Sequence, residues 1–492
     1  MERLRSTKVV ATIGPACDSV EAIQELIRAG MSVARLNFSH GNHESLRALG
    51  EQVRRAASEI GANVALMADT RGPEIRTGPL RDGPIGLVRG VLFSLHPLPL
   101  QPAGKADQRS DGGSERRPGG RPGDAEGVSV SYARLGRELE VGVSIFLDDG
   151  TMELCVESAD EEEIRCRVVR GGELGAYKGL SVPSVDLDLP LLGPADLDDL
   201  RFIAESDFDY VAASFVRGAE DIESIRRVLR DHGAEIPILA KIEHRRAVEN
   251  LEALIDAADG TMVARGDLGV ELPVERVPVV QKRIIRATVQ AGKPVITATQ
   301  MLDSMVRNPR PTRAEASDVA NAILDGTSAV MLSAETATGR HPTEAVRMMA
   351  TIAREAELAL SEYGDLQRME PRALDRLTDA VAHAATTIAS RTEAAAILTL
   401  TETGNTSRSI SKYRPECPIL AVSRSAQVIR RLALNWGVTG LLYEGDDDDL
   451  QKVDFGIERA REICARPGDV LVVTAGISSA SGSTNLVRIV HV

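Results

Sequence analysis

The chain has 492 residues, of which 43% are hydrophobic, 26% charged and only 3% aromatic. This length is too great for one ordinary domain, and the composition is typical of a globular protein with an aliphatic core. The net charge of −14 argues against a nucleic-acid-binding protein, although it leaves small anionic substrates open.

The five cysteines have no spacing that indicates a zinc site or a disulfide framework. We therefore expect reduced thiols and a cytoplasmic protein. The first residues, MERLRSTKVV, lack the apolar centre of a signal peptide, and no apolar run is long enough to span a bilayer. No membrane partner is predicted.

Eight short apolar runs lie within the first 335 residues, and gaps long enough for a helix separate most of them. Runs rich in Val, Ile, Ala and Leu are typical of strands in a buried parallel sheet. They comprise residues 8–14, 33–39, 64–70, 210–216, 237–243, 260–267, 294–300 and 329–335. We therefore expect an α/β fold, a TIM (β/α)₈ barrel with its active site at the carboxyl ends of the strands. Ser19 and Gly30 have the positions of an N-cap and a C-terminal glycine around the first barrel helix.

The gap of about 140 residues between the third and fourth runs is too long for a helix and its loops. Short runs broken by turn signals predict an inserted all-β lid domain, with a hairpin at Asp149-Gly150. These runs are residues 128–132, 144–147, 152–156 and 164–169. The stretch Pro97–Gly127, rich in Gly, Pro, Arg and Asp, predicts a disordered or mobile loop.

After a predicted helix at 342–359, a new alternation of helices and strands predicts a separate open α/β domain. Its predicted helices are 378–390, 407–413 and 426–434, and its predicted strands are 394–401, 418–423, 438–443, 470–474 and 487–492. The run Asp446–Asp449 indicates a solvated loop or a helix start rather than a metal site. The expected domains are the barrel at 1–72 and 182–355, the lid at 73–181 and the C-terminal domain at 356–492.

Charged side chains end the fifth and sixth predicted strands. Lys241 and Glu243 are two residues apart, so the alternation of a strand points both to the same face. They form either a structural ion pair or part of a site in which Glu243 and Asp267 bind a hard cation such as Mg²⁺. Such an ion beside Lys241 and Arg35 suits a substrate with phosphate and carboxylate groups.

Oxygen-bearing side chains end the second and third predicted strands. They would together surround a monovalent cation and are Asn37, Ser39, Asp69 and Thr70. Alternatively, Ser39 and Thr70 only cap the helices that follow. His40 and His43, taken singly, are more typical of loop hydrogen bonds than of catalysis.

Two basic residues flank the predicted lid. Arg76 follows Gly72-Pro73-Glu74 at the outgoing crossing, and Lys178 lies at the return crossing. Both would meet a polyphosphate as the lid closes; alternatively, both are ordinary solvated cations. The chain has no GxxxxGK[ST] loop and no GxGxxG motif, so any nucleotide binds without a P-loop.

Several motifs make the chain resemble the pyruvate kinase family over nearly its whole length. They include TKVVATIGPA, DTRGPEIRTG, ILAKIE, DGTMVARGDLGVELP, SKYRP and the long block from GKPVITATQ to LSAETATG. The resemblance implies a barrel, an inserted β lid and a C-terminal α/β domain. It also implies phosphoryl transfer from phosphoenolpyruvate to ADP, giving pyruvate and ATP, by an allosteric homotetramer.

The resemblance assigns roles residue by residue. Glu243 and Asp267 would bind Mg²⁺ (or Mn²⁺). The K⁺ ligands would be Asn37, Ser39, Asp69 and Thr70, and Glu74 is typical of potassium-dependent members. Phosphoenolpyruvate would contact Arg35, Lys241, Gly266, Asp267 and Thr299. The catalytic residues would be Lys241, Arg35, Thr299 and Ser333, the last two in a proton relay. ADP would contact Asn37, His40, Arg76 and Lys178.

The same resemblance places a sugar-phosphate or nucleotide effector at a loop before a C-terminal helix. The loop residues are Thr401, Thr403, Gly404, Asn405 and Thr406, with Ser481–Thr484 as a second hydroxyl-rich segment. Glu402 argues against fructose 1,6-bisphosphate, and a helix cap without a ligand is the alternative. The chain departs from the family pattern at Arg71, Ser181–Ser184, His244–Ala247 and Ser333-Ala334-Glu335.

Two other functions fit a barrel of this kind. A magnesium-dependent lyase or aldolase acting through an enolate would lack the lid insert and Lys178. A catalytically inactive metabolite sensor would have lost Lys241, Glu243, Asp267 or Arg35, and all four are present. An assay for pyruvate formation from phosphoenolpyruvate and ADP separates the three functions.

Overall fold

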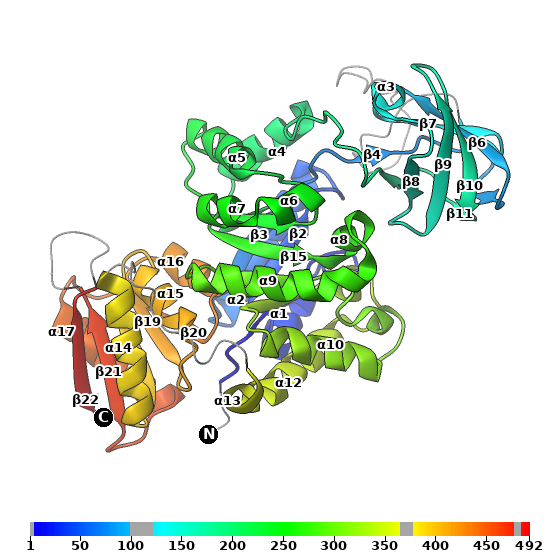
Figure 1. Ribbon diagram of the computed structural model, residues 1–492. Helices are drawn as coiled ribbons and strands as arrows, with labels where there is room; N and C mark the ends of the chain where they lie inside the picture. The colour runs from blue at the N-terminus through cyan, green and yellow to red at the C-terminus, as the bar shows by residue number, and fades with distance from the viewer. Residues whose placement is uncertain (1–3, 99–121, 365–376, 477–483) are drawn as a thin grey trace.

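The computed structural model describes residues 4–98, 122–364, 377–476 and 484–492. A C-terminal α/β region and a β-sheet lid lie at opposite ends of a central barrel (Figure 1). Most of the stretch Pro97–Gly127, predicted to be a disordered or mobile loop, lies outside the described residues. None of the helices formed by the described residues is both long and apolar enough to cross a membrane.

The eight predicted barrel strands form a closed parallel barrel. They are β1 (Lys8–Thr12), β2 (Val33–Asn37), β3 (Ala65–Asp69), β13 (Tyr210–Ala213), β14 (Ile238–Ile242), β15 (Gly260–Ala264), β16 (Val295–Ala298) and β17 (Ala329–Leu332). Parallel pairing of Lys8 on β1 with Ala329 on β17 closes the ring. The prediction of a (β/α)₈ barrel is confirmed.

Helices surround the barrel and are joined to its strands by short loops. They are α1 (Val20–Ala29), α2 (His43–Glu59), α4 (Pro194–Ala204), α5 (Ala219–Asp231), α6 (Arg245–Glu249), α7 (Leu251–Ala257), α8 (Arg265–Glu271), η1 (Val274–Arg276), α9 (Val277–Gln290), η2 (Asp303–Val306), α10 (Arg313–Leu324), α11 (Ala334–Ala337), α12 (Pro342–Leu358) and α13 (Leu360–Tyr363). The ends of α1 lie where the sequence predicts them. Ser19 accepts a hydrogen bond from the Ala22 N–H at 3.2 Å, and Gly30 ends the helix with φ of +124°.

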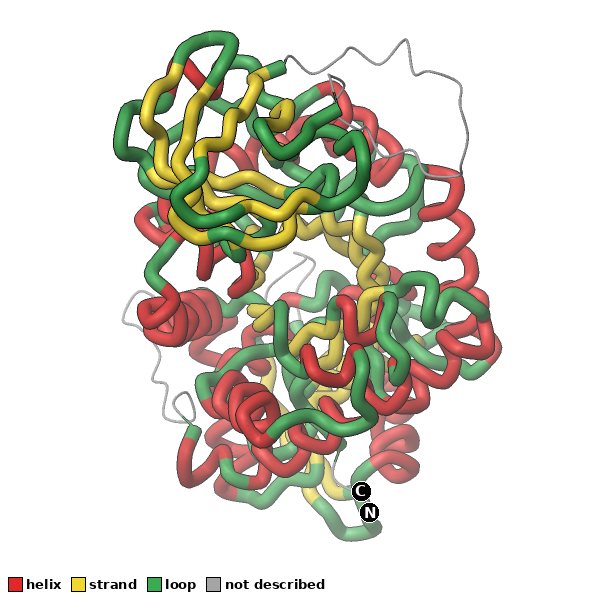
Figure 2. The backbone as a smooth tube through the Cα atoms, turned by 90° about the vertical axis from the view of Figure 1, so that its right-hand side faces the viewer, coloured by secondary structure: helices red, strands yellow, loops and turns green. Residues whose placement is uncertain are grey.

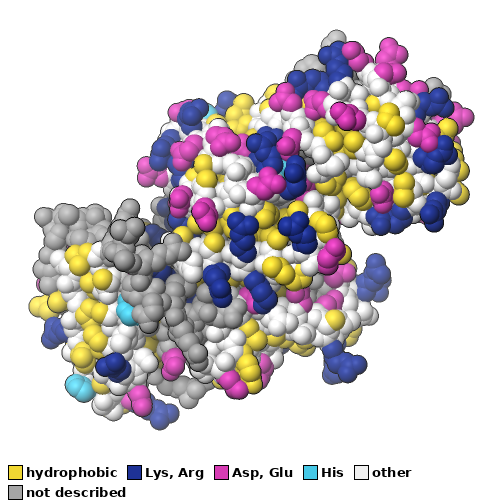
Figure 3. Space-filling view, viewed as in Figure 1, with side chains coloured by type: hydrophobic (Ala, Val, Ile, Leu, Met, Phe, Trp, Pro, Cys, Tyr) yellow, Lys and Arg dark blue, Asp and Glu magenta, His cyan; other side chains and the backbone are white. Residues whose placement is uncertain are grey.

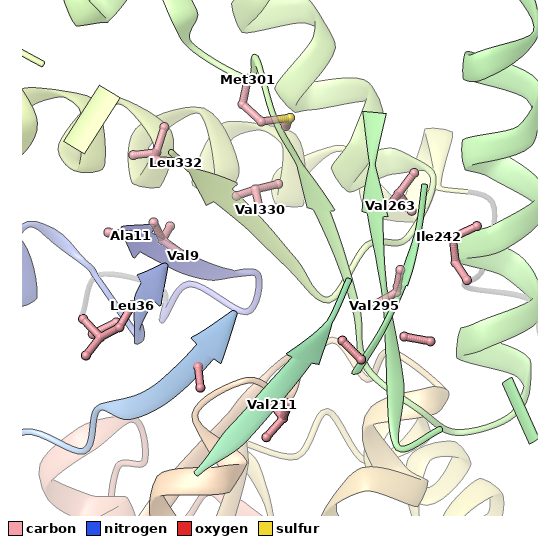
Figure 4. Packing of buried hydrophobic residues seen from close by; sticks show 14 of the residues in the cluster. Val9, Ala11, Leu36, Val211, Ile242, Val263, Val295, Met301, Val330 and Leu332 are labelled. Atoms are coloured by element: carbon pink, nitrogen blue, oxygen red, sulfur yellow. The ribbon is translucent and has the colours of Figure 1, made fainter. Parts of the chain in front are cut away.

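Alternate residues of the barrel strands supply two separate apolar layers. Val9, Leu36 and Val330 belong to the layer that packs under the helices (Figure 4). The neighbouring Val10 and Val33 belong to the layer that fills the barrel itself. Both layers are mainly aliphatic, which agrees with the aromatic content of 3%.

The C-terminal region closes the amino-terminal end of the barrel. Leu434, which follows α16 (Ala426–Leu432), is fully buried in the same cluster as Val10 and Met67. Beside it, Arg430 Nε lies 3.0 Å from an oxygen of Asp209, a fully buried carboxylate just before β13. An apolar contact and an ion pair therefore join the two regions.

The insert between β3 and β13 consists mainly of strands and loops (Figure 2). The strands form a seven-stranded sheet of order β4-β12-β8-β9-β10-β6-β7 and a two-stranded sheet of β11 and β5. The strands are β4 (Ile75–Arg76), β5 (Ile85–Leu87), β6 (Leu92–Pro97), β7 (Gly127–Val130), β8 (Ser144–Leu147), β9 (Met152–Ala159), β10 (Ile164–Arg170), β11 (Gly172–Leu174) and β12 (Gly179–Ser181). The predicted hairpin joins β8 to β9, whose register pairs Leu147 with Met152. In space-filling view, the lid projects from the barrel, and charges of both signs mix over its surface (Figure 3).

The lid is built on β-sheets, as predicted, and contains one helical turn besides. The single helical turn α3 (Leu135–Glu138) follows β7 and buries Leu135 in the core of the lid. A turn this short is too brief to show helical periodicity in a sequence, which explains why it was not predicted.

The C-terminal residues form the predicted open α/β sheet, of order β20-β19-β18-β21-β22. Its strands are β18 (Ala396–Leu400), β19 (Ile419–Ser423), β20 (Val438–Leu442), β21 (Val470–Ala475) and the antiparallel β22 (Leu486–His491). Its other helices are α14 (Leu377–Arg391), α15 (Asn405–Lys412) and α17 (Asp449–Ile463). Helix α17 is absent from the predicted alternation. Asp448 caps it by accepting from the N–H groups of Leu450 and Gln451, so the acidic run is a helix start.

Replacing Leu434 by alanine should lower the free energy of unfolding by about 2–5 kcal/mol, because it leaves a cavity at the end of the barrel. Urea unfolding followed by circular dichroism measures this change. Leu450→Ala is the control, since Leu450 on α17 is 66% exposed. It should change the same free energy by less than about 0.5 kcal/mol. Equally small changes in both variants would contradict the closing role of Leu434.

Candidate active site

Four charged side chains form a chain of ion pairs at the carboxyl ends of β2, β3 and β14. Arg35 Nε lies 2.6 Å from Asp69 Oδ2, and Asp69 Oδ1 lies 3.1 Å from Lys241 Nζ. Lys241 Nζ is also 3.3 Å from Glu243 Oε2. Both carboxylates are buried. The same-face placement of Lys241 and Glu243 is confirmed, and the ion pair given as the alternative is also present.

The two carboxylates in this row of ion pairs are neutralised by their neighbours to different extents. Burial alone would raise the pKa of Asp69, but Arg35 and Lys241 outweigh it and the pKa is lowered. Burial also opposes the charge on Lys241, yet Asp69 and Glu243 raise the pKa of its ammonium group above the ordinary value. Burial raises the pKa of Glu243 to about 8, with Lys241 opposing this shift and Asp267 adding to it. Asp69 is therefore the better neutralised carboxylate of the two.

Glu243 and Asp267 line one cleft, whose other walls include Glu74 and Asp149 of the lid. Asp267 lies in the first turn of α8. Glu243 Oε2 is buried and accepts no hydrogen bond. Lys241 Nζ lies 3.3 Å from this oxygen, and two carboxylates that line one cleft fit a hard divalent ion. No larger group of metal-ligating side chains, with three or more His, Cys, Asp or Glu, occurs among the described residues.

The end of β13 contributes two site residues that were not predicted from the sequence. Ser214 Oγ accepts a hydrogen bond from Lys241 Nζ at 2.7 Å and donates to the Thr70 carbonyl at 2.6 Å. The Phe215 N–H donates to Glu243 Oε1 at 2.6 Å. The one sequence signal for them was their place at the end of the fourth apolar run.

A second polar contact joins the ends of β15 and β16. The Gly266 N–H donates to Thr299 Oγ1 at 2.8 Å, which brings together two of the predicted substrate residues. Thr299 and Gln300 have φ of +66° and +53°, so the chain after β16 is strained. Ser333 lies before α11, where its N–H donates to Glu335 Oε2 at 2.7 Å. Among the described residues, no hydrogen bond links Ser333 to Thr299.

Two family models match the chain. The pyruvate kinase barrel domain matches residues 4–108 and 114–346, and the pyruvate kinase alpha/beta domain matches residues 379–490. The chain belongs to the pyruvate kinase family. It is 41% identical to the pyruvate kinase of Clostridium acetobutylicum over 99% of both chains. The pyruvate kinases of Bacillus licheniformis and Geobacillus stearothermophilus are 43% and 44% identical to it, over 99% of this chain and 80% of theirs.

Membership of the pyruvate kinase family confirms the resemblance and the predicted enzyme class, a phosphotransferase. The residues predicted to hold K⁺ lie together at the ends of β2 and β3, where Asn37 and Asp69 are paired in register. The Ser39 N–H donates to Asn37 Oδ1 at 3.1 Å. The alternative that Ser39 and Thr70 cap helices is wrong, because Asn42 caps α2 and Thr70 leads into the lid. The cation role stays a prediction.

The lid residues predicted to contact ADP lie on neighbouring strands. Arg76 on β4 pairs in register with Gly179 on β12, directly after Lys178. The side chain of Arg76 is 37% exposed and lies 2.7 Å from Glu74, and that of Lys178 is 42% exposed and lies 2.9 Å from Asp148. His40 is exposed in the loop after β2. Their contact with ADP stays a prediction.

Two other histidines and one departure from the family pattern have structural partners. His43 begins helix α2 rather than lying in a loop, and its Nε2 lies 2.7 Å from Asp199 Oδ1 on α4. Arg71 Nε lies 2.9 Å from the other oxygen of Asp199. His244 caps α6 by accepting from the Arg246 N–H at 3.1 Å. The altered loop after β14 is therefore ordered beside Glu243.

The predicted effector loop leads into helix α15 of the C-terminal region. Gly404 is the N-cap of α15 with φ of +82°, and its N–H donates to Thr401 Oγ1 at 2.9 Å. Thr406 Oγ1 lies 2.6 Å from Thr484 Oγ1, which brings the two hydroxyl-rich segments together. Thr403 and Asn405 are exposed, and residues 481–483 lie outside the described part of the chain. The helix start is present, and the effector stays a prediction.

Replacing Asp69 by asparagine should lower the free energy of unfolding by about 3–5 kcal/mol, because two buried cations lose their shared carboxylate. Urea unfolding at pH 7 measures this change. The matched control is Asp446→Asn at an exposed position. It should change that free energy by less than about 0.5 kcal/mol. An Asp69→Asn protein as stable as its parent would show that Asp69 does not hold the chain of ion pairs together.

Proposed function

We propose that this protein transfers the phosphoryl group of phosphoenolpyruvate to ADP, giving pyruvate and ATP. The observation that carries the proposal is the buried chain of Arg35, Asp69, Lys241 and Glu243 beside the cleft that Asp267 lines. Fixed cations next to carboxylates suit a substrate that carries phosphate and carboxylate groups and arrives with a divalent ion. Pyruvate formation by the purified protein, measured with phosphoenolpyruvate and ADP, tests the proposal against the lyase and sensor alternatives.

Glu243 and Asp267 would hold Mg²⁺ (or Mn²⁺), since Glu243 offers a buried oxygen that accepts no hydrogen bond. Bound there, the ion would stabilise negative charge on the phosphoryl and enolate oxygens. The K⁺ ligands would be Asn37, Ser39, Asp69 and Thr70. All of these side chains offer oxygen donors, which hard cations prefer.

Arg35 and Lys241 would hold the phosphoryl group. Arg35 is fixed by Asp69 and by the Thr12 hydroxyl, which accepts from its Nη1 at 2.9 Å. Lys241 is fixed by Asp69 and Ser214 and stays charged. In a reaction that is mostly electrostatic, positive charge already in place stabilises the phosphoryl group in flight.

The transfer breaks the bond between phosphorus and the enol oxygen while a β-phosphate oxygen of ADP bonds to phosphorus. The enolate then takes a proton on its methylene carbon to give pyruvate. Thr299 and Ser333 would take part in delivering that proton. The Gly266 N–H and the Thr299 hydroxyl, 2.8 Å apart, would bind the carboxylate end of the substrate.

The remaining parts of the proposal concern nucleotide and regulation. ADP would contact Asn37, His40, Arg76 and Lys178 as the lid closes. The proposed domains are the barrel at 1–72 and 182–355, the lid at 73–181 and the regulatory domain at 356–492. A sugar phosphate or nucleotide would bind at Thr401–Thr406, and the enzyme would act as a homotetramer in the cytoplasm. Activity titrated against sugar phosphates and AMP identifies the effector.

Lys241→Met should lower kcat by about 10³-fold or more, because a fixed cation aimed at the transferring group is lost. Phosphoenolpyruvate binding should be largely intact, since Arg35, Gly266 and Thr299 are unchanged. A coupled assay gives kcat and titration calorimetry gives the affinity. Lys282→Met, at a side chain that is 54% exposed, is the control and should retain turnover. Full turnover by Lys241→Met would refute the role of this lysine.

Glu74→Lys should weaken activation by K⁺, because it brings a fixed ammonium group into the cleft that Glu74 lines. The ratio of activities with and without K⁺, at constant ionic strength, measures this effect. Glu51→Lys on α2, at an exposed position, is the control for the charge change and should leave the ratio unaltered. A Glu74→Lys protein with the parent's K⁺ dependence would show that Glu74 has no part in activation by K⁺.

A further inference from the structure

The turn after β13 contacts Lys241 and Glu243 on one side and Gly72, where the chain leaves the barrel for the lid, on the other. Ser214 contacts Lys241, and the Phe215 N–H donates to Glu243 Oε1 at 2.6 Å. This hydrogen bond fixes one oxygen of Glu243, while the other, Oε2, is buried and accepts no hydrogen bond. The Phe215 N–H therefore helps to set the direction of Oε2, which lies 3.3 Å from Lys241 Nζ.

Phe215 has φ of +56°, a left-handed conformation that is rare for a residue with a bulky side chain. Glycine would adopt this φ without strain, so the backbone conformation alone gives no reason for an aromatic ring at this position. Such strain persists where the surrounding structure holds it. The contacts of the ring therefore indicate what holds the turn.

The ring packs against Gly72, the residue at which the chain leaves the barrel for the lid. Gly72 has φ of +72°, and a Cβ added to it would lie 2.6 Å from Phe215 Cδ2 and 3.1 Å from Ser214 Cβ. Hence the lid crossing and the turn are in direct contact. A shift of either backbone must displace the other.

We propose that Phe215 is a positioning residue, which holds the Glu243 carboxylate for a divalent cation and couples it to the lid crossing at Gly72. The inference rests on the proposed function only in taking Glu243 as a ligand of the divalent ion. Phe215 contacts the ligand through its N–H and the crossing through its ring. Movement of the lid crossing is thereby transmitted to the oxygen that faces the cation.

Mn²⁺ binding by the full chain without substrates, followed by electron paramagnetic resonance, tests this role. Phe215→Ala keeps the N–H but removes the ring, including the Cδ2 that lies beside Gly72, so the turn is free to relax. We expect it to weaken Mn²⁺ binding about 10-fold, as loss of partners of metal ligands does. Phe215→Tyr keeps the ring and should bind Mn²⁺ within about twofold of the parent, since the ligand's partner is retained.

Phe208→Ala is the matched control, because it truncates a buried ring just before the other end of β13. It should lower thermal stability and leave Mn²⁺ affinity unchanged. Unchanged Mn²⁺ affinity in Phe215→Ala, or equal weakening in Phe208→Ala, overturns the positioning role. Absence of Mn²⁺ binding by the parent overturns it as well. Pyruvate formation by the parent is a separate measurement, so failure of the proposed function is distinguishable from failure of this inference.

A double-mutant cycle tests the coupling to the lid crossing. Gly72→Ala should weaken Mn²⁺ binding in the parent, because the added Cβ displaces the Phe215 ring. In the Phe215→Ala background this additional loss should be at least about threefold smaller, since the Cδ2 that the added Cβ would meet is gone. The cycle cancels the strain that alanine itself suffers at positive φ. Independent losses from the two substitutions would contradict the coupling.

Discussion

A carboxylate buried at the end of a barrel strand must find positive charge, and this requirement organises the site. Asp69 is neutralised by Arg35 and Lys241, which share its two oxygens. Glu243 shares Lys241 with Asp69, and its Oε2, 3.3 Å from Lys241 Nζ, accepts no hydrogen bond. The unequal compensation makes Asp69 a fixed structural anchor and leaves Glu243 the less neutralised of the two carboxylates.

Strand β13 connects this chemistry to the rest of the molecule. Just before its start, Asp209 is paired with Arg430 of the C-terminal region, and Leu434 closes the barrel beside it. After its end, Ser214 and Phe215 contact Lys241 and Glu243. A rigid strand thus has the C-terminal region at one end and the charged groups at the other. The C-terminal region and the charged groups are therefore joined by one continuous packed element.

The strands and the hairpin that follow from local sequence pattern were predicted correctly. Apolar runs of strand length located all eight barrel strands, and Asp149-Gly150 located a lid hairpin. Helix α3 and the contacts of Ser214 and Phe215 escaped prediction, because they depend on tertiary neighbours and on φ rather than on periodicity. Helix α2 begins three residues later than a cap at Ser39 would require, and Asn42 caps it instead. Such a small difference in the start of a helix cannot be read from the sequence pattern.

The cations of the barrel and of the lid are held in different ways, which suits them to different tasks. Arg35 and Lys241 are only 11% and 12% exposed and are fixed by buried partners, so they can act on a bound group without reorganisation. Arg76 and Lys178 are 37% and 42% exposed, and their carboxylate partners are half-buried or exposed. Exposed ion pairs contribute little free energy, so a polyphosphate can replace these partners at small cost. The barrel therefore supplies fixed charge, and the lid supplies charge that can be exchanged.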